Sequence, residues 1–376
     1  MNFDFAETES ALCEKIKALF DPESIAALAK LENGEADEIR EATVKWLRIL
    51  GQAGYLTLGL DDGKNSVTLT AIQEGLATIS PSLFLTVEVT ARIFGRLVAI
   101  YGTPDQKDEI IPSLQEGRLI GAVAISEDAM NIENDPLNTT GVSNDEGFLV
   151  SGSKGHVVNG PIADWIAVAA KTGDGLAFFL VKKETKRLAI GQRLSMLGYD
   201  GLAISRVSLE NCPVPSNYII GPFDGEEQLK TVRMWEDQIL TASALGLIKR
   251  SLDAALTFAK GHRSGNKPII AYQEVGFQLA EMVTLFQTAQ LLAYRAAWMA
   301  EAGDTEAAVL AHCAKVFCTE SAEEVASHAL QILGGRGYVS GNPAEEGYRD
   351  AKYLQIAGTS SEISRMKIAD GVLGDW

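Results

Sequence analysis

The stretch from 331 to 365, close to the end of the chain, constrains the fold more than any other part of the sequence. A long helical pattern stops there at three closely spaced glycines, Gly334, Gly335 and Gly337. Glycine reaches positive φ without steric cost, so such a run turns the backbone and lets another backbone or a phosphate come close. The chain then continues through Arg349-Asp-Ala-Lys352 into Gln355-Ile-Ala-Gly-Thr-Ser-Ser-Glu-Ile-Ser-Arg365. We therefore expect a turn followed by a short closing helix.

These two parts, in this order, resemble the C-terminal signature of the acyl-CoA dehydrogenase family, flavoenzymes that desaturate CoA thioesters. The segment Gly102-Thr-Pro-Asp-Gln106, with the Pro-x-Leu-x-x-Gly pattern that ends at Gly117, is also similar to the family. The resemblance covers nearly the whole chain and is most specific at its C-terminal end. It implies an FAD-dependent oxidoreductase that acts on an acyl-CoA.

The sequence departs from the family at the position of the catalytic base. In most members the segment after Arg-Asp-Ala-Lys reads Gln-Ile-Tyr-Glu-Gly-Thr-Ser-Glu, and its first Glu removes the substrate proton. Counted without gaps, that Glu falls on Gly358, and a shift of one residue places it on Ala357. Neither side chain can accept a proton, so the base must lie elsewhere or be absent.

Composition excludes several other functions. The 376 residues suffice for two or three domains, and 33 basic against 50 acidic residues give a net charge of −17, which disfavours nucleic acid and anionic membranes. The N-terminus is acidic, unlike a signal peptide, and no apolar run could span a bilayer. The four cysteines fit a reduced setting best, so we expect a cytoplasmic protein. The four cysteines and four histidines show no ligand spacing, and we expect no metal site.

The apolar periodicity predicts an α+β order of helices, strands and helices. Residues 1–118 read as an N-terminal helical domain, including a helix over 39–50 that a glycine cap at Gly51 would end. Residues 119–228 alternate like strands and predict a small β-barrel or sandwich, in which proline stops pairing at 213–215. Residues 229–376 predict three long helices and a closing one, a four-helix bundle. This is also the layout that the family resemblance implies.

The resemblance places FAD between the middle domain and the C-terminal bundle. Ala124-Ile-Ser126-Glu127 resembles the family's Thr-Glu motif, whose hydroxyl contacts the flavin, but residues 128–133 lack the family's glycine and serine. In Gly152-Ser-Lys154-Gly-His156-Val157-Val158, His156 takes the place of an aromatic wall, and Val158 replaces a hydroxyl that donates to flavin N5. The alternative is an ordinary strand ending in a turn.

Other positions would serve the flavin region or the adenosine half of a neighbouring subunit's FAD. The alternative for Gln273 and Gln331 is that they are polar residues on helix surfaces. The family has an arginine ahead of the glutamine that matches Gln273, and this arginine contacts the partner subunit's FAD. Counted back from Gln273, its position falls on His262, so Arg263 fits only with a one-residue deletion. The resemblance implies that the cofactor contacts are Ser126, His156, Val158, Arg263, Gln273, Gln331, Gly334, Gly335, Ser360 and Glu362.

Three carboxylates are candidates for a relocated base. Counting back from Ala244-Leu-Gly246 places the family's Glu-Arg pair on Glu236 and Asp237, and the branch that includes isovaleryl-CoA dehydrogenase has its base at the position of Glu236. Consecutive helical residues diverge by about 100°, so only one of the two can face the flavin. Asp237 reverses the charge of the family's arginine. A surface ion pair with Arg233 is the alternative role of Glu236.

Glu88 is the third candidate because it interrupts the apolar run Leu83–Val89, and a lone carboxylate there is costly unless it is used or paired. Some alicyclic acyl-CoA dehydrogenases use an acid from this helix region. A helical ion pair with Arg92 is the alternative. In the family, the backbone N–H of the base residue also donates to the thioester oxygen, a donor that Gly358 retains.

Two interpretations remain open. One is an acyl-CoA dehydrogenase for a branched or alicyclic acyl group with a relocated base. The other is a catalytically inactive partner subunit of a hetero-oligomer. The resemblance further implies an electron-transferring flavoprotein as electron acceptor and a homotetramer.

Overall fold

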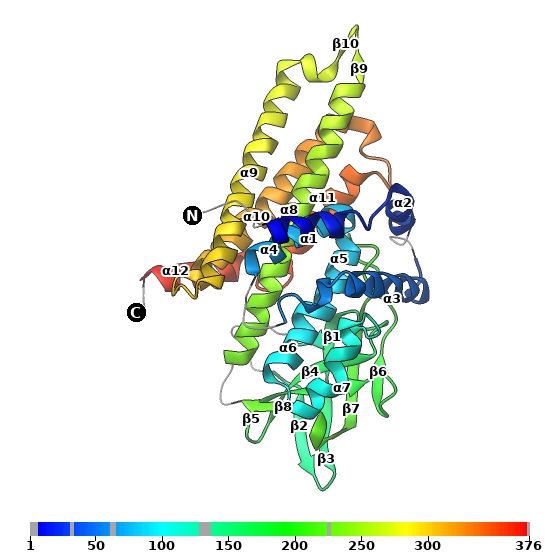
Figure 1. The fold of residues 1–376 in the computed structure, drawn as a ribbon, viewed down its shortest axis with the longest axis vertical. Helices are drawn as coiled ribbons and strands as arrows, with labels where there is room; N and C mark the ends of the chain where they lie inside the picture. The colour runs from blue at the N-terminus through cyan, green and yellow to red at the C-terminus, as the bar shows by residue number, and fades with distance from the viewer. Residues whose placement is uncertain (1–6, 31–33, 61–64, 128–136, 224–226, 374–376) are drawn as a thin grey trace.

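The computed structural model describes residues 7–30, 34–60, 65–127, 137–223 and 227–373, and it places a β-sheet at one end and a long helical bundle at the other (Figure 1). The N-terminal helices lie between them and contact both, because α4 packs on α8 and the segment 89–95 packs on β1. Among the described residues, no helix combines the length and the apolar character that crossing a membrane requires.

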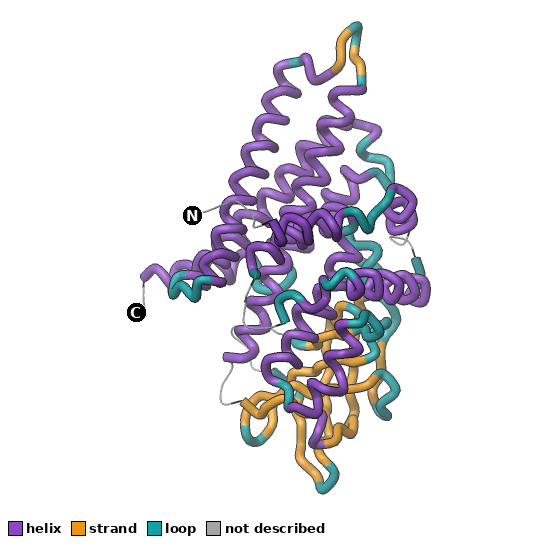
Figure 2. Tube along the Cα trace, in the orientation of Figure 1, coloured by secondary structure: helices purple, strands orange, loops and turns teal. Residues whose placement is uncertain are grey.

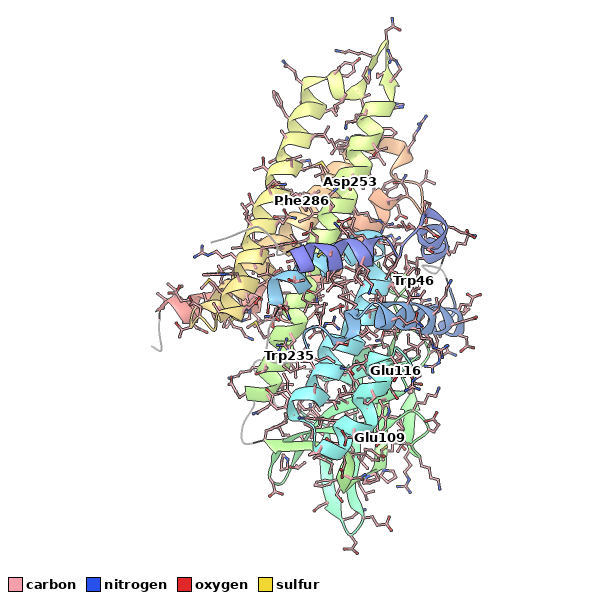
Figure 3. All side chains as sticks on the ribbon, viewed as in Figure 1. Trp46, Glu109, Glu116, Trp235, Asp253 and Phe286 are labelled. Atoms are coloured by element: carbon pink, nitrogen blue, oxygen red, sulfur yellow. The ribbon has the colours of Figure 1, made fainter. Side chains whose placement is uncertain are left out.

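The predicted N-terminal helical region is present. Ser80 and Thr103 begin two of its helices as N-caps, each followed by a proline at the first helical position. Trp46 lies on α3 (Figure 3). Its ring stacks on that of Phe20, with the ring centroids 4.3 Å apart. The helices are α1 (Glu7–Lys17), α2 (Pro22–Lys30), α3 (Ala36–Gln52), α4 (Ser66–Ile79), α5 (Pro81–Glu88), a π-helical segment (Val89–Gly95), α6 (Arg96–Tyr101) and α7 (Pro104–Gln115).

Gly51 is not the helix cap that its position suggested. The helix α3 continues through Gly51 to Gln52, and the left-handed residue that follows is Gly54, with φ of +86°. Gly51 has another role, because a Cβ there would lie 2.6 Å from the carbonyl oxygen of Gln115 at the end of α7. The missing side chain therefore lets two backbones approach.

The middle region is one eight-stranded sheet in the order β6-β7-β3-β2-β4-β5-β8, with β1 beside β4. Side chains of the sheet form a hydrophobic cluster of their own, which includes Val150, Val168, Phe179 and Val207. The strands are β1 (Gly121–Ala124), β2 (Thr140–Asn144), β3 (Gly147–Val158), β4 (Trp165–Thr172), β5 (Gly175–Lys182), β6 (Leu188–Ile190), β7 (Ile204–Pro215) and β8 (Ile219–Phe223).

The prediction that proline stops the pairing of β7 is wrong. Pro213 and Pro215 pair with Leu149 and Gly147 of β3. On its other side β7 meets β6 only at residues 207–209, so its last residues form a sheet edge there. A proline can lie in a strand where its missing N–H faces such an edge.

The C-terminal region is the predicted helical bundle (Figure 2). Its described residues form one helix more than expected. The closing helix is split in two at residues 357–360, where Gly358 has φ of +64°. The helices are α8 (Glu227–Gly261), α9 (Gln273–Glu301), α10 (Ala307–Leu333), α11 (Pro343–Ile356) and α12 (Ser361–Leu373). A short hairpin of β9 (Arg263–Ser264) and β10 (Lys267–Pro268) joins α8 to α9.

Candidate active site

A cavity of about 320 Å³ lies where the sheet meets the C-terminal helices. The sheet, the loop before β7, the first turns of α8, and the end of α11 with the residues after it all contribute. The lining residues are Ser126, His156, Val158, Met196, Leu197, Gly198, Ile204, Arg233, Glu236, Arg349, Lys352, Tyr353, Ile356, Ala357 and Gly358. The fold thus brings five of the predicted site residues together from segments that are far apart in the sequence.

Arg233 connects the two sides of this cavity. Its Nη1 donates to Glu236 Oε2 at 2.7 Å, and its Nη2 donates to Ser126 Oγ at 2.7 Å. The guanidinium is buried, and its Nε has no hydrogen-bond partner within the described part of the chain. The ion pair expected at the surface therefore exists, but it lies in the cavity.

The motif Arg349-Asp350 fastens the loop before β7 to the bundle. Arg349 Nη1 donates to the carbonyl of Leu197 and to Asp200 Oδ2, both at 2.7 Å. Its Nε donates to Glu345, and these carboxylates raise the pKa of Arg349. Asp350 Oδ1 accepts from the backbone N–H of Tyr199 at 2.5 Å. These contacts hold Leu197 and Gly198 at the cavity.

Asp237 lies behind the cavity wall, and its side chain is 1% exposed. Its Oδ1 accepts from the backbone N–H of Thr359 at 2.8 Å and lies 3.7 Å from Lys315 Nζ. Burial raises the pKa of Asp237 to about 6, although Lys315 and Thr359 oppose this shift. Since Glu236 lines the cavity and Asp237 does not, the two diverge as consecutive helical residues should.

Glu88 is fully buried away from this cavity. Its Oε1 accepts from Tyr55 Oη at 2.5 Å, and its Oε2 accepts from Gln73 Nε2 at 2.6 Å and lies 3.9 Å from Arg92 Nε. Burial and, to a smaller extent, the neighbouring carboxylate of Glu88 raise the pKa of Tyr55. Glu88 therefore has partners that account for its place in an apolar run.

The remaining predicted residues lie elsewhere. Ser360 directly precedes α12 and Glu362 lies in its first turn, and Ser360 Oγ accepts from the backbone N–H of Ile363 at 3.4 Å. Beyond the cavity, the ends of α8 and α10 meet, because Arg336 stacks over Phe258. Five predicted cofactor contacts lie at that end and are exposed: Arg263, Gln273, Gln331, Gly334 and Gly335. The loop 128–133 lies outside the described residues.

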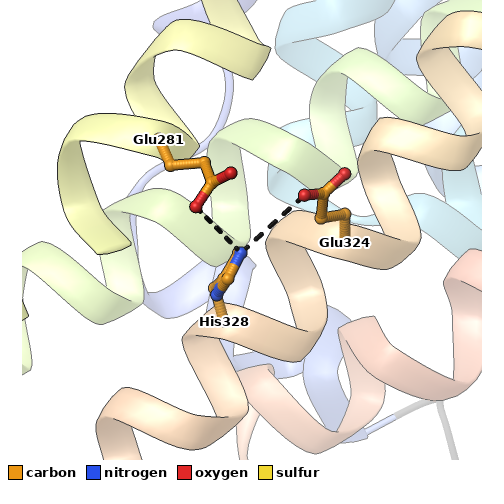
Figure 4. Close-up of side chains that lie close together, drawn as sticks. All are labelled: Glu281, Glu324 and His328. Atoms are coloured by element: carbon orange, nitrogen blue, oxygen red, sulfur yellow. Dashed lines mark ion pairs between the residues drawn. The ribbon is translucent and has the colours of Figure 1, made fainter. Parts of the chain in front are cut away.

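One His and two Glu side chains meet on the bundle surface (Figure 4). His328 Nε2 lies 3.6 Å from Glu281 Oε2 and 3.9 Å from Glu324 Oε1, so α9 and α10 share this cluster. The i,i+4 spacing of Glu324 and His328 was visible in the sequence but was not identified. Both carboxylates are exposed and form ion pairs with the histidine, and we assign no metal to them.

Comparison with known proteins identifies the family. The model for the acyl-CoA dehydrogenase middle domain matches residues 122–212, and the model for the acyl-CoA dehydrogenase C-terminal domain matches residues 227–373. The chain belongs to the acyl-CoA dehydrogenase family. These two matches contain every lining residue of the cavity.

Relatives match nearly the full length of this chain. Benzylmalonyl-CoA dehydrogenase of Aromatoleum aromaticum is 29% identical over 99% of this chain and 100% of its own. The 3-(aryl)acrylate reductase of Clostridium sporogenes is 27% identical over 98% of this chain and 100% of its own. The structure of butyryl-CoA dehydrogenase from Megasphaera elsdenii has the same fold, with a TM-score of 0.90 at 23% identity over 99% and 100% of the two chains.

The residues of the cavity fit the FAD that this family uses. Leu197 and Ile356 line it and are 69% and 66% exposed, which leaves apolar surface for a planar ring to cover. Arg233 Nε is a buried donor with no partner among the described residues, and Ser126 provides a hydroxyl. These side chains, with Val158 and His156, are the residues that would hold the flavin ring.

The sequence did not predict the roles of Arg233 and Lys315. Arg233 was considered only as a surface partner of Glu236. Lys315 has a recognisable signal, because it lies on the same helical face as Ala311 and Cys318, both buried. A lysine in an apolar stripe needs an internal partner, but the sequence does not reveal that the partner lies at 357–359.

Proposed function

We propose that this protein is an FAD-dependent dehydrogenase of acyl-CoA thioesters in which Glu236 is the base. The observation that carries the proposal is the shared cavity, because Glu236 lines it together with Gly358, Ser126 and Val158, whereas Glu88 is buried among other partners. FAD, when bound, supplies the two-electron acceptor. Glu236 would take the proton from the carbon beside the thioester carbonyl.

The backbone supports the same assignment. Gly358 lines the cavity, and its N–H has no acceptor among the described residues, so it is available to donate to the thioester oxygen. Such a donor stabilises the negative charge that develops as the proton leaves.

We propose a branched or ring-bearing acyl group. The names of two relatives, benzylmalonyl-CoA dehydrogenase and 3-(aryl)acrylate reductase, point to aromatic substrates of those proteins. An electron-transferring flavoprotein as acceptor and a homotetrameric assembly are part of the same proposal, on the family resemblance.

The test is substrate-driven bleaching of the flavin. Glu236→Gln should bind FAD normally and lose the bleaching that an acyl-CoA causes in the absence of oxygen, because its amide cannot accept a proton. Glu88→Gln is the matched control and should keep the bleaching. The opposite result would assign the base to Glu88 and refute the role of Glu236.

An inactive partner subunit is the second candidate, and one observation favours it. Arg233 holds Glu236 at 2.7 Å, and a carboxylate paired in this way is a weak base. If no thioester bleaches the flavin of the FAD-loaded protein, this candidate replaces the first. Purification of the protein from its natural source would then identify a partner subunit.

A further inference from the structure

The segment 357–359, which forms one wall of the cavity, is held from behind by two buried charges. Lys315 Nζ donates to the carbonyl of Ala357 at 3.0 Å and also to the carbonyl of Thr359. Asp237 Oδ1 accepts from the N–H of Thr359 at 2.8 Å. Lys315 is fully buried and Asp237 is 1% exposed, and their charged atoms lie 3.7 Å apart. The polar backbone groups on both sides of Gly358 are therefore tied to this pair.

Gly358 itself is fitted to the pair. Its φ of +64° is a left-handed conformation that L side chains rarely adopt. A Cβ at this position would lie 2.6 Å from Asp237 Oδ1, 2.8 Å from Leu240 Cδ1 and 3.4 Å from Glu236 Cγ. The carboxylate of Asp237 thus occupies the space into which a side chain at 358 would begin.

We propose that Asp237 and Lys315 are the positioning residues of this site: they fix the 357–359 segment so that the Gly358 N–H is free to donate into the cavity next to Glu236. This inference rests on the proposed function. It also links two departures that looked independent in the sequence. Asp237 occupies the space in which a side chain at position 358 would begin. Position 358 therefore cannot carry the base, and the base has to come from another lining residue.

The experiment compares the FAD-loaded wild type with the double variant Asp237→Asn/Lys315→Met. This variant removes both charges, so it leaves no unpaired buried ion, but methionine cannot donate to the two carbonyls. We expect the turnover number with an acyl-CoA that the wild type oxidises to fall about 100-fold, the typical effect of losing one oxyanion donor, with KM changed less than about threefold. The carbonyl stretch of the bound thioester should move back toward its frequency in water.

Two controls separate positioning from general damage. Asp237→Asn/Lys315→Gln keeps a donor near the carbonyls and should recover part of the turnover and of the carbonyl shift. Lys249→Met/Asp253→Asn removes an exposed ion pair of the same helix and should change neither. A double variant Asp237→Asn/Lys315→Met with wild-type turnover and carbonyl frequency would overturn the inference.

Two further outcomes are also decisive. If the Asp237→Asn/Lys315→Met variant does not fold, the Asp237→Asn/Lys315→Gln and Asp237→Ala variants replace it. Unchanged turnover and carbonyl frequency in Asp237→Ala would then overturn the inference. If the wild type oxidises no thioester, the proposed function fails, and amide hydrogen exchange of residues 357–359 decides the positioning role. That exchange should be faster in the variants without the pair, and equal rates would refute the role.

Discussion

The close fit between Gly358 and Asp237 predicts a measurable cost of adding a single methyl group. In Gly358→Ala, a non-glycine residue at φ of +64° costs about 1–2 kcal/mol. The new Cβ must also displace Asp237 Oδ1 and Leu240 Cδ1 from 2.6 and 2.8 Å, and such overpacking costs about 1–3 kcal/mol. The sum of roughly 2–5 kcal/mol should lower Tm by about 2–6 °C in a chain of 376 residues, because the unfolding entropy grows with chain length.

Thermal unfolding of the FAD-loaded protein, at one scan rate and one FAD concentration, measures this change. Gly276→Ala in α9 is the matched control, because open space surrounds that position and Tm should stay the same or rise. In an Asp237→Ala background the Asp237 clash is gone, so Gly358→Ala should lower Tm by less than it does in the wild type. An equal loss in both backgrounds would refute the idea that Asp237 fills the space beside position 358.

Two predictions concern pH. Burial alone would raise the pKa of Glu127, but hydrogen bonds from Thr139 and Lys154 outweigh it and lower the pKa to about 2, below its ordinary 4.5. The unfolded chain therefore binds more protons between these values, so Tm should fall as the pH falls through this window, and Glu127→Gln should flatten that slope. Burial raises the pKa of Asp237 from 3.8 to about 6, beside Lys315, His312, Glu236 and Arg233. Between these two pH values the folded state keeps a proton on Asp237 that the unfolded chain has lost. The Tm of the wild type minus the Tm of Asp237→Asn/Lys315→Met should therefore decrease as the pH rises from 3.8 to 6.

The sequence was sufficient for the order of helices, strands and helices, because each region has its own apolar period. It was not sufficient for features that depend on a distant backbone. Gly51 looked like a helix cap, yet it is a glycine because Gln115 of α7 comes close. Pro213 looked like a strand end, yet β7 continues because β6 covers only part of it. Both depend on packing between segments, which local patterns do not contain.

The candidate site was predicted in part for the same reason. Ser126, His156, Val158, Glu236 and Gly358 were identified by position and do line one cavity. Arg233 was recognised only as a neighbour of Glu236 in the helix, since its contact with Ser126 spans 107 positions. Asp237 replaces the family's arginine with the opposite charge, which the sequence does not explain. Its contacts with Lys315 and with the backbone N–H of Thr359 do explain an acid at this position. Whether Glu236 acts as the base stays a prediction.

The most direct test of the account is the visible absorbance of the FAD-loaded wild type, recorded without oxygen while a panel of branched, alicyclic and aromatic acyl-CoAs is added. The account predicts a yellow protein that bleaches with at least one of them and does not bleach with the same thioester in Glu236→Gln. A protein that binds FAD but keeps its absorbance with every thioester, or a Glu236→Gln variant that bleaches like the wild type, would contradict it.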